Sequence, residues 1–236
     1  MTFARGRALI LIMVLLVAVG AIAFTRSRPQ PPQERPTLLF LSSLPLVFGE
    51  GFSLDEEGSA TLKALQSRYR VAPISVTSPE ELRKGRLLLM AHPLAQPAED
   101  LVALDEWVRG GGHVLLLADP LLEWPSERPL GDPLRPPPMF MDTGLLKHWG
   151  LRLDAPDKRG AAVRELGGKK VMTLSPGILS GSCEVSADRL VGRCRIGKGR
   201  ATIVADADLL DVSRLGEGAS ANLNGLLSEL AQLDAK

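Results

Sequence analysis

Apolar residues along this chain fall into short continuous runs that alternate with amphipathic segments. Short continuous apolar runs are typical of strands buried on both faces of a parallel sheet, and they predict strands at residues 37–43, 70–76, 86–91 and 113–118. The amphipathic segments between these runs predict helices at residues 53–69, 79–84 and 97–109. Strands and helices that alternate over short connections predict a parallel sheet with right-handed crossovers and helices on both faces.

Local signals at the helix ends support this assignment. Ser53 and Glu56 have the spacing of a capping box at the start of the first helix. The helix at 97–109 starts at a proline, carries acidic residues in its first turn and ends in Arg109 before three glycines. The N-terminal half therefore predicts a flavodoxin-like or Rossmann-like sheet, in which ligands bind beyond the carboxyl ends of the strands.

The second half of the chain has a different pattern. Residues 121–141 are rich in proline, without a regular period, and predict a long loop directly after the fourth strand. A helix capped by Asp142 is predicted at 142–149. Further β-prone pieces lie at 151–153, 161–166, 170–174, 178–185 and 190–196, and we interpret residues 161–196 as a small antiparallel β insertion. A further sheet strand at 200–205 and closing helices at 206–212 and 219–233 complete a single α/β domain over residues 37–236.

The first 36 residues predict an anchor and a linker. Residues 8–24 are uncharged and mostly aliphatic, with Arg5 and Arg7 before them and Arg26 and Arg28 after them. We interpret residues 1–25 as a signal anchor that crosses a membrane once; the alternatives are a cleaved signal peptide and a buried soluble helix. The proline-rich residues 26–36 predict an extended linker. The positive amino terminus favours a cytoplasmic N-terminus and an outward-facing domain.

Composition excludes several classes of protein. Lys and Arg number 28 and Asp and Glu 27, so a dedicated nucleic-acid binder is not expected. Two cysteines are too few for a disulfide-stapled miniprotein or a structural zinc cluster. Removing residues 1–25 removes two arginines and no acids, which leaves 26 basic and 27 acidic side chains and a net charge of −1. The body therefore has no polybasic attraction to anionic lipid.

The two cysteines lie in neighbouring β-prone runs. If Cys183 and Cys194 face each other across a hairpin, they form a disulfide, which requires an oxidising compartment and agrees with an outward-facing domain. The alternatives are two free cysteines and a metal or redox pair.

Candidate ligand-binding residues lie where strands end. Asp119 follows the fourth strand, Asp206 follows the late strand, and His92 follows the third. Parallel, adjacent strands would bring the two aspartates together in a pocket for a polar ligand or a metal; the alternative is that both cap helices and turns. The sequence has no Gly-x-Ser-x-Gly elbow, no P-loop and no close histidine spacing, so we predict no cofactor, no metal and no catalytic residue.

The loop at 121–141 is the candidate partner-binding segment. Trp124 lies among prolines, and Arg128 and Arg135 follow it. An exposed aromatic side chain in such a loop suits protein binding; the alternative is that the loop packs on its own domain.

Several segments resemble one protein family. Residues 101–120 (LVALDEWVRGGGHVLLLADP), 144–153 (GLLKHWGLRL), 197–211 (GKGRATIVADADLLD) and 221–230 (ANLNGLLSEL) resemble the GldG-like auxiliary components of uncharacterised ABC-type transport systems. The resemblance implies an extracytoplasmic domain with a class I glutamine-amidotransferase-like architecture and no assigned activity. The chain looks closer to short, membrane-anchored bacterial proteins that carry the same domain than to the full-length members of the family. Neither cysteine follows a predicted parallel strand at a sharp turn, so the amidotransferase nucleophile is not identifiable.

These observations favour a binding or accessory module without catalysis. We expect it on the periplasmic side of a bacterial inner membrane, anchored through residues 8–24, with a protein partner in the membrane or envelope. One alternative is a carboxylate- or metal-dependent hydrolase or transferase that uses Asp119 and Asp206. Another is a structural spacer subunit of an envelope complex.

Overall fold

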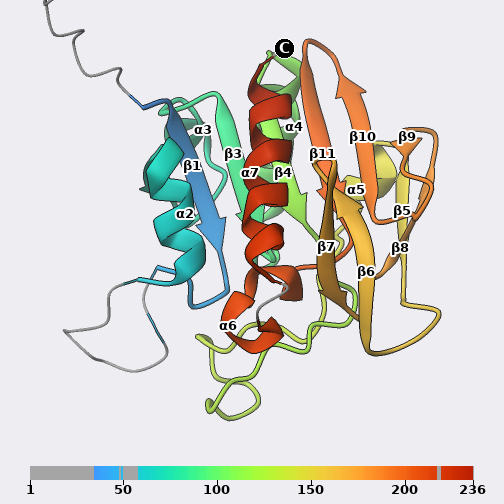
Figure 1. The fold of residues 1–236 in the computed structure, drawn as a ribbon. Coiled ribbons are helices and arrows are strands. Elements are labelled where there is room, and N and C mark those ends of the chain that lie inside the picture. Colours follow the sequence, from blue (N-terminus) through green and yellow to red (C-terminus); the bar gives the residue numbers. More distant parts are fainter. Residues whose placement is uncertain (1–34, 48, 50–57, 217–218, 236) are drawn as a thin grey trace, which may run out of the picture. The chain divides into compact units, whose positions relative to one another are not determined.

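A central sheet of seven strands organises the molecule, in the order β2-β1-β3-β4-β11-β10-β9 (Figure 1). The computed structural model describes residues 35–47, 49, 58–216 and 219–235. The sheet strands are β1 (Thr37–Ser42), β2 (Arg70–Pro73), β3 (Leu87–Ala91), β4 (His113–Leu117), β9 (Glu184–Val185), β10 (Val191–Ile196) and β11 (Gly199–Val204). The first five strands in this order are parallel, and β10 and β9 are antiparallel to their neighbours. The five parallel strands have the order of a flavodoxin-like sheet.

Alternation along the central strands explains why they are apolar throughout. In β1, Leu38 and Phe40 pack on one face of the sheet, whereas Leu39 and Leu41 pack on the other. Strands β3 and β4 alternate in the same way, and every residue of both is buried. Each face therefore needs its own layer of helices to cover it.

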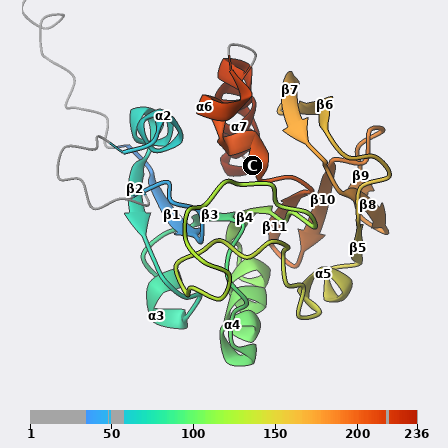
Figure 2. The ribbon, with the colours of Figure 1, turned by 90° about the horizontal axis from the view of Figure 1, so that it is seen from below.

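Helices cover the sheet on both sides (Figure 2). One face packs against α2 (Ala60–Arg68) and α7 (Ser220–Asp234), and the other against α3 (Pro79–Leu82), α4 (Ala98–Arg109) and α5 (Leu145–His148). The α/β architecture with helices on both faces is therefore confirmed. It places the carboxyl ends of the five parallel strands along one edge.

The first helix begins later than predicted. α2 starts at Ala60, and the hydroxyl of Ser59 accepts a hydrogen bond from the Leu62 amide at 3.1 Å. Ser59, not Ser53, is thus the capping residue of this helix. The predicted capping box of Ser53 and Glu56 lies outside the described residues.

The predicted antiparallel insertion at 161–196 does not form one separate unit. β6 (Ala161–Leu166) and β7 (Lys169–Leu174) pair only with each other, and β8 (Ile178–Gly181) pairs with β5 (Leu151–Asp154). The remaining strands, β9 and β10, extend the main sheet instead. A tight turn between β10 and β11 causes this, because it forces β10 to lie antiparallel beside a core strand. Gly197 makes the turn with φ of 58°, and a Cβ there would lie 2.7 Å from the Arg109 carbonyl oxygen.

Two short helices replace the predicted helix at 206–212. A 3-10 helix spans Asp208–Leu210, and α6 spans Val212–Leu215. Asp211 separates them with non-helical backbone angles, and its carboxylate accepts a hydrogen bond from the Arg214 amide at 3.2 Å. The predicted helix at 142–149 is reduced to α5, where Asp142 accepts hydrogen bonds from the Gly144 and Leu146 amides at 3.0 and 3.3 Å.

The predicted anchor and most of the linker lie outside the described residues. Residues 8–24, to which the membrane span was assigned, belong to this part of the chain. Among the helices that are described, none combines the length and apolar character needed to cross a bilayer.

Candidate functional site

The candidate site lies at the edge where the parallel strands end. In the sheet, β2 lies beside β1 on one side, whereas β4 lies beside β3 on the opposite side. The order in which the chain adds strands therefore reverses between β1 and β3, which makes this the topological switch point of the sheet. Ligand sites of open α/β sheets lie outside the strands at such a point. Residues 118–144, which contain the proline-rich loop, run across this edge (Figure 2).

The structure brings Asp119 and Asp206 close enough to interact electrostatically, as the strand order predicts. Both side chains are fully buried. Asp119 accepts hydrogen bonds from the amides of Leu121 and Ala207, both at 2.8 Å. Asp206 accepts hydrogen bonds from the amides of Leu174 and Leu209 at 3.0 and 2.7 Å. These carboxylates fix the backbone of the segments that leave β4 and β11, and they present no surface to a ligand.

Burial disfavours the ionised form of these two carboxyl groups. Loss of solvation raises the pKa of Asp119 to about 6, although amide hydrogen bonds oppose the shift. Desolvation, together with repulsion by Asp119, holds the pKa of Asp206 well above its ordinary value. Two carboxyl groups that discourage each other's ionisation retain a proton near neutral pH more readily than isolated ones.

Asp208 is a third buried carboxyl group at this edge. Its Oδ2 accepts a hydrogen bond from the Glu123 amide at 2.8 Å, whereas its buried Oδ1 has no hydrogen-bond partner within the described ranges. Desolvation raises the pKa of Asp208 to about 7. Its role matches that of Asp119: it ties the start of the loop to the segment after β11.

His92, which follows β3, also forms a hydrogen bond to the loop. Its side chain is fully buried, and Nε2 lies 2.9 Å from the carbonyl oxygen of Pro137. Because a carbonyl oxygen only accepts, Nε2 must donate, which leaves Nδ1 as an unprotonated acceptor. Desolvation lowers the pKa of His92 to about 4, so the ring is neutral at pH 7. His92 therefore holds the far end of the loop.

The loop is tied together at its base and at its tip. At the base, the Leu122 amide donates to the Pro138 carbonyl at 3.0 Å. At the tip, Arg128 lies 3.5 Å from the carboxylate of Asp132, and Arg135 donates to the Arg128 carbonyl. The two arginines predicted to contact a partner are thus used within the loop, and they fix the shape of its tip.

Trp124 is half-buried and packs against the core cluster on the α2 and α7 side of the sheet. It also lines a groove of about 570 Å³ at the strand-end edge. The groove is enclosed by the segment after β1, the start of α2, the start of the loop and the segment before α6; its walls include Leu46, Thr61, Trp124, Asp211 and Arg214. The alternative that Trp124 packs on its own domain is therefore confirmed. The Trp124 side chain also lines the groove, and its contact with a protein partner stays a prediction.

Apart from Trp124, the sequence analysis did not find the groove residues. Thr61 and Leu210 meet only in the folded chain, where the Thr61 hydroxyl donates to the Leu210 carbonyl at 2.9 Å across 149 positions. No local pattern marks such a pair. The ordinary helix-start signal at Ser59 is the one cue in the sequence that bears on this wall of the groove.

The loop also exposes apolar side chains beyond the groove. Leu130 and Leu134 at the tip are 83% and 67% exposed, and Met139 and Met141 are 50% and 53% exposed. Monomeric soluble proteins seldom concentrate large apolar side chains on one surface segment without a function.

In the part of the chain that the structure describes, no group of three or more His, Cys, Asp or Glu side chains could hold a metal ion. Asp119 and Asp206 are fully buried and bonded to amides, so no groove surface brings a substrate to them. This arrangement counts against the alternative of a hydrolase or transferase that uses these two residues.

Cys183 and Cys194 form a disulfide with their Cα atoms 4.9 Å apart. It links β10 to the residue before β9, on the side of the sheet that packs against α5. The disulfide lies away from the strand-end groove, so its contribution is to the stability of the sheet edge.

Comparisons with known proteins agree with this fold. A family model described as an ABC-type uncharacterized transport system matches residues 35–156. No curated protein matches the sequence. A solved structure, cytoplasmic protein STM3548 from Salmonella typhimurium, is 12% identical with a TM-score of 0.52, over 83% of this chain and 98% of that protein. The exo-beta-1,4-mannosidase Op5Man5 from an Opitutaceae bacterium is 13% identical with a TM-score of 0.47, over 86% of this chain, which spans 35% of the mannosidase.

The Salmonella likeness concerns the fold alone, and it confirms the expected glutamine-amidotransferase-like architecture. The mannosidase likeness is too weak to bear on activity. The family match covers the segment from β1 to β5, which includes the switch point of the sheet, His92, Asp119 and the loop itself, whereas Asp206 and Asp208 lie outside it.

Proposed function

Because the chain belongs to the family described as ABC-type uncharacterized transport system, we propose that it is an accessory module that binds a protein subunit of such a system and performs no catalysis. The binding surface is the strand-end groove together with the loop at 121–141. The module works on the periplasmic face of a bacterial inner membrane, where residues 8–24 anchor it.

The exposed apolar loop is the observation that carries this proposal. Leu130, Leu134, Met139 and Met141 project from it, and Trp124 lines the adjoining groove. Trp and Met are enriched in protein interfaces, and Trp is among the residue types that carry most of the binding energy. This surface therefore suits another protein better than it suits a small polar ligand.

The way in which the loop is held supports the same proposal. Asp119, Asp208 and His92 fix it from beneath through hydrogen bonds to its backbone. A loop that is ordered before binding loses less conformational entropy when the partner docks. The buried polar groups at this edge thus serve recognition by holding the loop in shape.

The proposed compartment rests on two features. Residues 8–24 form an apolar stretch flanked by arginines, as in a signal anchor. The disulfide between Cys183 and Cys194 favours an oxidising compartment such as the periplasm.

A pair of variants tests the loop as the binding surface. Leu130→Ser combined with Leu134→Ser removes two exposed apolar side chains that make no contribution to the core. We expect the full chain with these changes to fold normally but to lose at least 10-fold in co-purification with the membrane subunits of the transport system when they are co-expressed. Val102→Ser is the matched control, because Val102 is 58% exposed on α4 and lies away from the loop.

Equal co-purification of the wild type, the loop variant and the control would reject the loop as the binding surface. Turnover of a substrate by the purified chain would reject the absence of catalysis.

A further inference from the structure

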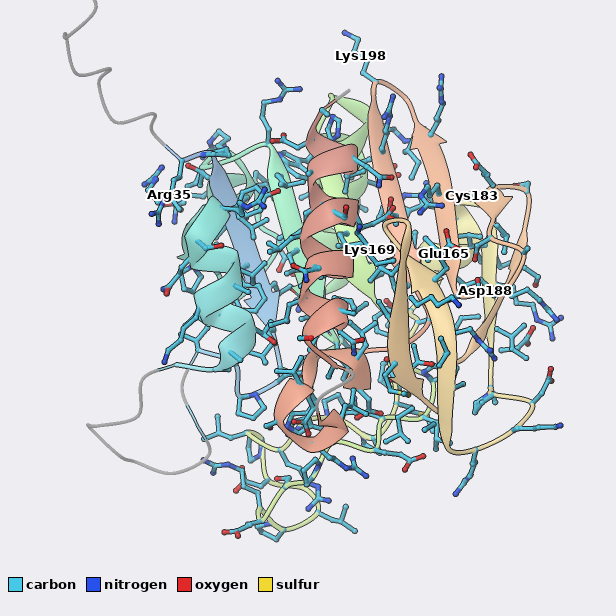
Figure 3. All side chains as sticks on the ribbon, viewed as in Figure 1. Arg35, Glu165, Lys169, Cys183, Asp188 and Lys198 are labelled. Carbon is cyan, nitrogen blue, oxygen red and sulfur yellow. A yellow bond between two sulfur atoms is a disulfide. The ribbon has the colours of Figure 1, made fainter. Side chains whose placement is uncertain are left out.

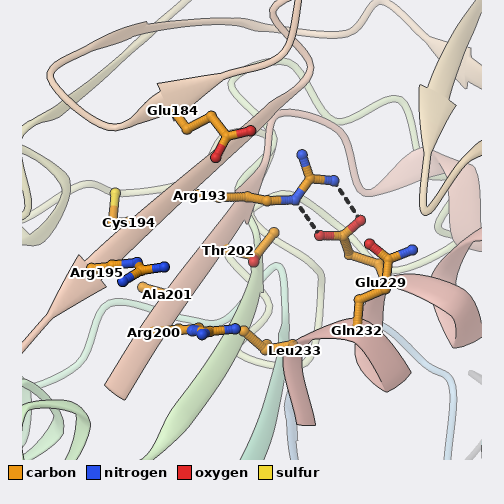
Figure 4. Close-up of a pocket in the computed structure, with 10 residues that line it drawn as sticks. All are labelled: Glu184, Arg193, Cys194, Arg195, Arg200, Ala201, Thr202, Glu229, Gln232 and Leu233. Carbon is orange, nitrogen blue, oxygen red and sulfur yellow. Dashed lines mark hydrogen bonds and ion pairs between the residues drawn. The ribbon is translucent and has the colours of Figure 1, made fainter. Parts of the chain in front are cut away.

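A second pocket, shown in Figure 4, lies on the sheet face that carries α7. Its volume is about 170 Å³, and it is formed by β10, β11 and the last turns of α7. Arg200 is the register partner of His113 at the first position of β4, so the pocket lies where the parallel strands begin. It is therefore separate from the strand-end groove, and nothing in the proposed function uses it.

One arginine of this pocket is paired with a carboxylate. Arg193 donates to both carboxylate oxygens of Glu229, at 2.8 and 2.7 Å, in a fork geometry (Figure 4). Glu229 is 1% exposed, and it also accepts a hydrogen bond from the Gly167 amide at 3.1 Å. The negative charge of Glu229 is thus committed to Arg193 and to a backbone amide.

Two further arginines lack such a partner. Arg195 and Arg200 are direct cross-strand partners in the β10–β11 ladder, and both line the pocket. Within the described ranges, neither forms an ion pair or a side-chain hydrogen bond. Like charges directly opposite each other across a ladder are destabilising, so this pair costs stability unless an anion compensates it.

The polar lining also includes Gln232, the hydroxyl of Thr202 and the carboxylate of Glu184, which is the register partner of Arg193 in the β9–β10 ladder. Thr202 is 2% exposed and lies on the same face as Arg200, two positions further along β11. Its side chain makes no hydrogen bond to any described residue. In Figure 4 the Thr202 side chain lies beside the arginines that line the pocket. By contrast, Lys198 at the nearby turn points away from the protein (Figure 3).

We propose that this pocket binds a single oxyanion of phosphate size between the guanidinium groups of Arg195 and Arg200, with the Thr202 hydroxyl as a further donor. Guanidinium groups offer paired N–H donors that match the oxygens of phosphate. A volume of about 170 Å³ lies below the roughly 300–1,000 Å³ that drug-sized ligands occupy. The pocket therefore takes the phosphate group itself, either as the free ion or as the head of a lipid whose remainder stays outside.

Calorimetric titration of the full chain in non-ionic detergent with inorganic phosphate, at low ionic strength, tests the site. We expect one phosphate per chain for the wild type. Arg195→Gln and Arg200→Gln should each weaken phosphate binding at least 10-fold. Arg152→Gln, which removes an exposed arginine of β5, is the control for the loss of one positive charge and should bind as the wild type does.

Thermal unfolding gives a second readout that does not depend on heat of binding. Without phosphate, Arg195→Gln should unfold at a higher temperature than the wild type, because the repulsion across the ladder is removed. Added phosphate should raise the unfolding temperature of the wild type and of Arg152→Gln but not that of Arg195→Gln.

Short-chain lipids added to the detergent solution distinguish the two sources of phosphate, because the full chain carries the proposed anchor and would enter vesicles of any composition. Arginine-dependent binding of short-chain phosphatidylglycerol but not of short-chain phosphatidylcholine would support an anionic lipid head, and binding of inorganic phosphate alone would support the free ion. The proposal is overturned if phosphate stabilises the wild type and Arg195→Gln equally, or if neither probe binds in a way that depends on Arg195 and Arg200.

Discussion

Individual buried polar residues at the strand-end edge determine the shape of the surface that solvent meets. Asp119, Asp206, Asp208 and His92 have almost no exposed area, yet each makes a hydrogen bond to backbone, several of them across long stretches of sequence. Buried polar groups are tolerated where hydrogen bonds compensate their lost solvation. Sequence reasoning placed Asp119 and Asp206 at one edge, because strand order decides that. It could not decide their role, because this depends on which amides the folded loop brings to them.

Asp208→Asn is predicted to change how stability depends on pH. The pKa of Asp208 is raised in the folded state from 3.8 to about 7, so the folded chain binds this proton more tightly than the unfolded chain does. Its contribution to stability is therefore fully present below pH 3.8 and is lost as the pH rises to about 7. Asn cannot ionise, so the variant should gain about 2–3 kcal/mol relative to the wild type between pH 5 and pH 8.

Urea unfolding at pH 5 and pH 8 measures this difference. Asp157→Asn, in which an exposed carboxylate is removed, should follow the wild type. A constant difference between Asp208→Asn and the wild type across this range would show that Asp208 does not titrate within it.

How well each strand could be predicted from the sequence depends on which neighbours it has in the fold. The strands β1, β3 and β4 were predictable, because burial on both faces requires an apolar residue at every position. The strand β10 was assigned to an insertion instead of the main sheet. Its own residues, with Arg193 and Arg195 on one face, are those of an edge strand, and only its turn into β11 reveals the sheet to which it belongs.

The disulfide at this sheet edge is predicted to stabilise the fold. Cys183 and Cys194 are separated by 11 positions, and closing such a loop contributes about 3 kcal/mol in the chain-entropy model. Changing both residues to serine should lower the free energy of unfolding by about this amount, as should treatment of the wild type with a reductant. Urea unfolding of the oxidised protein, the reduced protein and the double variant provides the comparison.

The oxidation state of the same two cysteines tests the proposed periplasmic location. Because a periplasmic domain keeps the disulfide, both thiols of the protein taken directly from cells should resist alkylation under denaturing conditions until a reductant is added. Labelling of both cysteines without reductant would contradict the periplasmic assignment.

At the scale of the whole molecule, the sheet order, the family and the exposed loop all favour a protein-binding surface at the strand-end edge. A flavodoxin-like order creates a switch point between β1 and β3, and the proline-rich loop lies across this edge. In many proteins of this architecture the edge holds a small ligand. Here buried carboxyl groups and His92 hold the loop, and the groove beside it is lined by Trp124, so the edge is suited to a protein partner.

In-cell photo-crosslinking tests this central claim most directly. A photoreactive amino acid is placed at Leu134, at the tip of the loop, and in a separate variant at Val102 on α4; both positions are more than half exposed. The account predicts that the Leu134 probe crosslinks to a membrane subunit of an ABC-type transport system, identified by mass spectrometry, and that the Val102 probe does not. Crosslinks to such a subunit from Val102 but not from Leu134 would contradict the account, as would the absence of such crosslinks from Leu134.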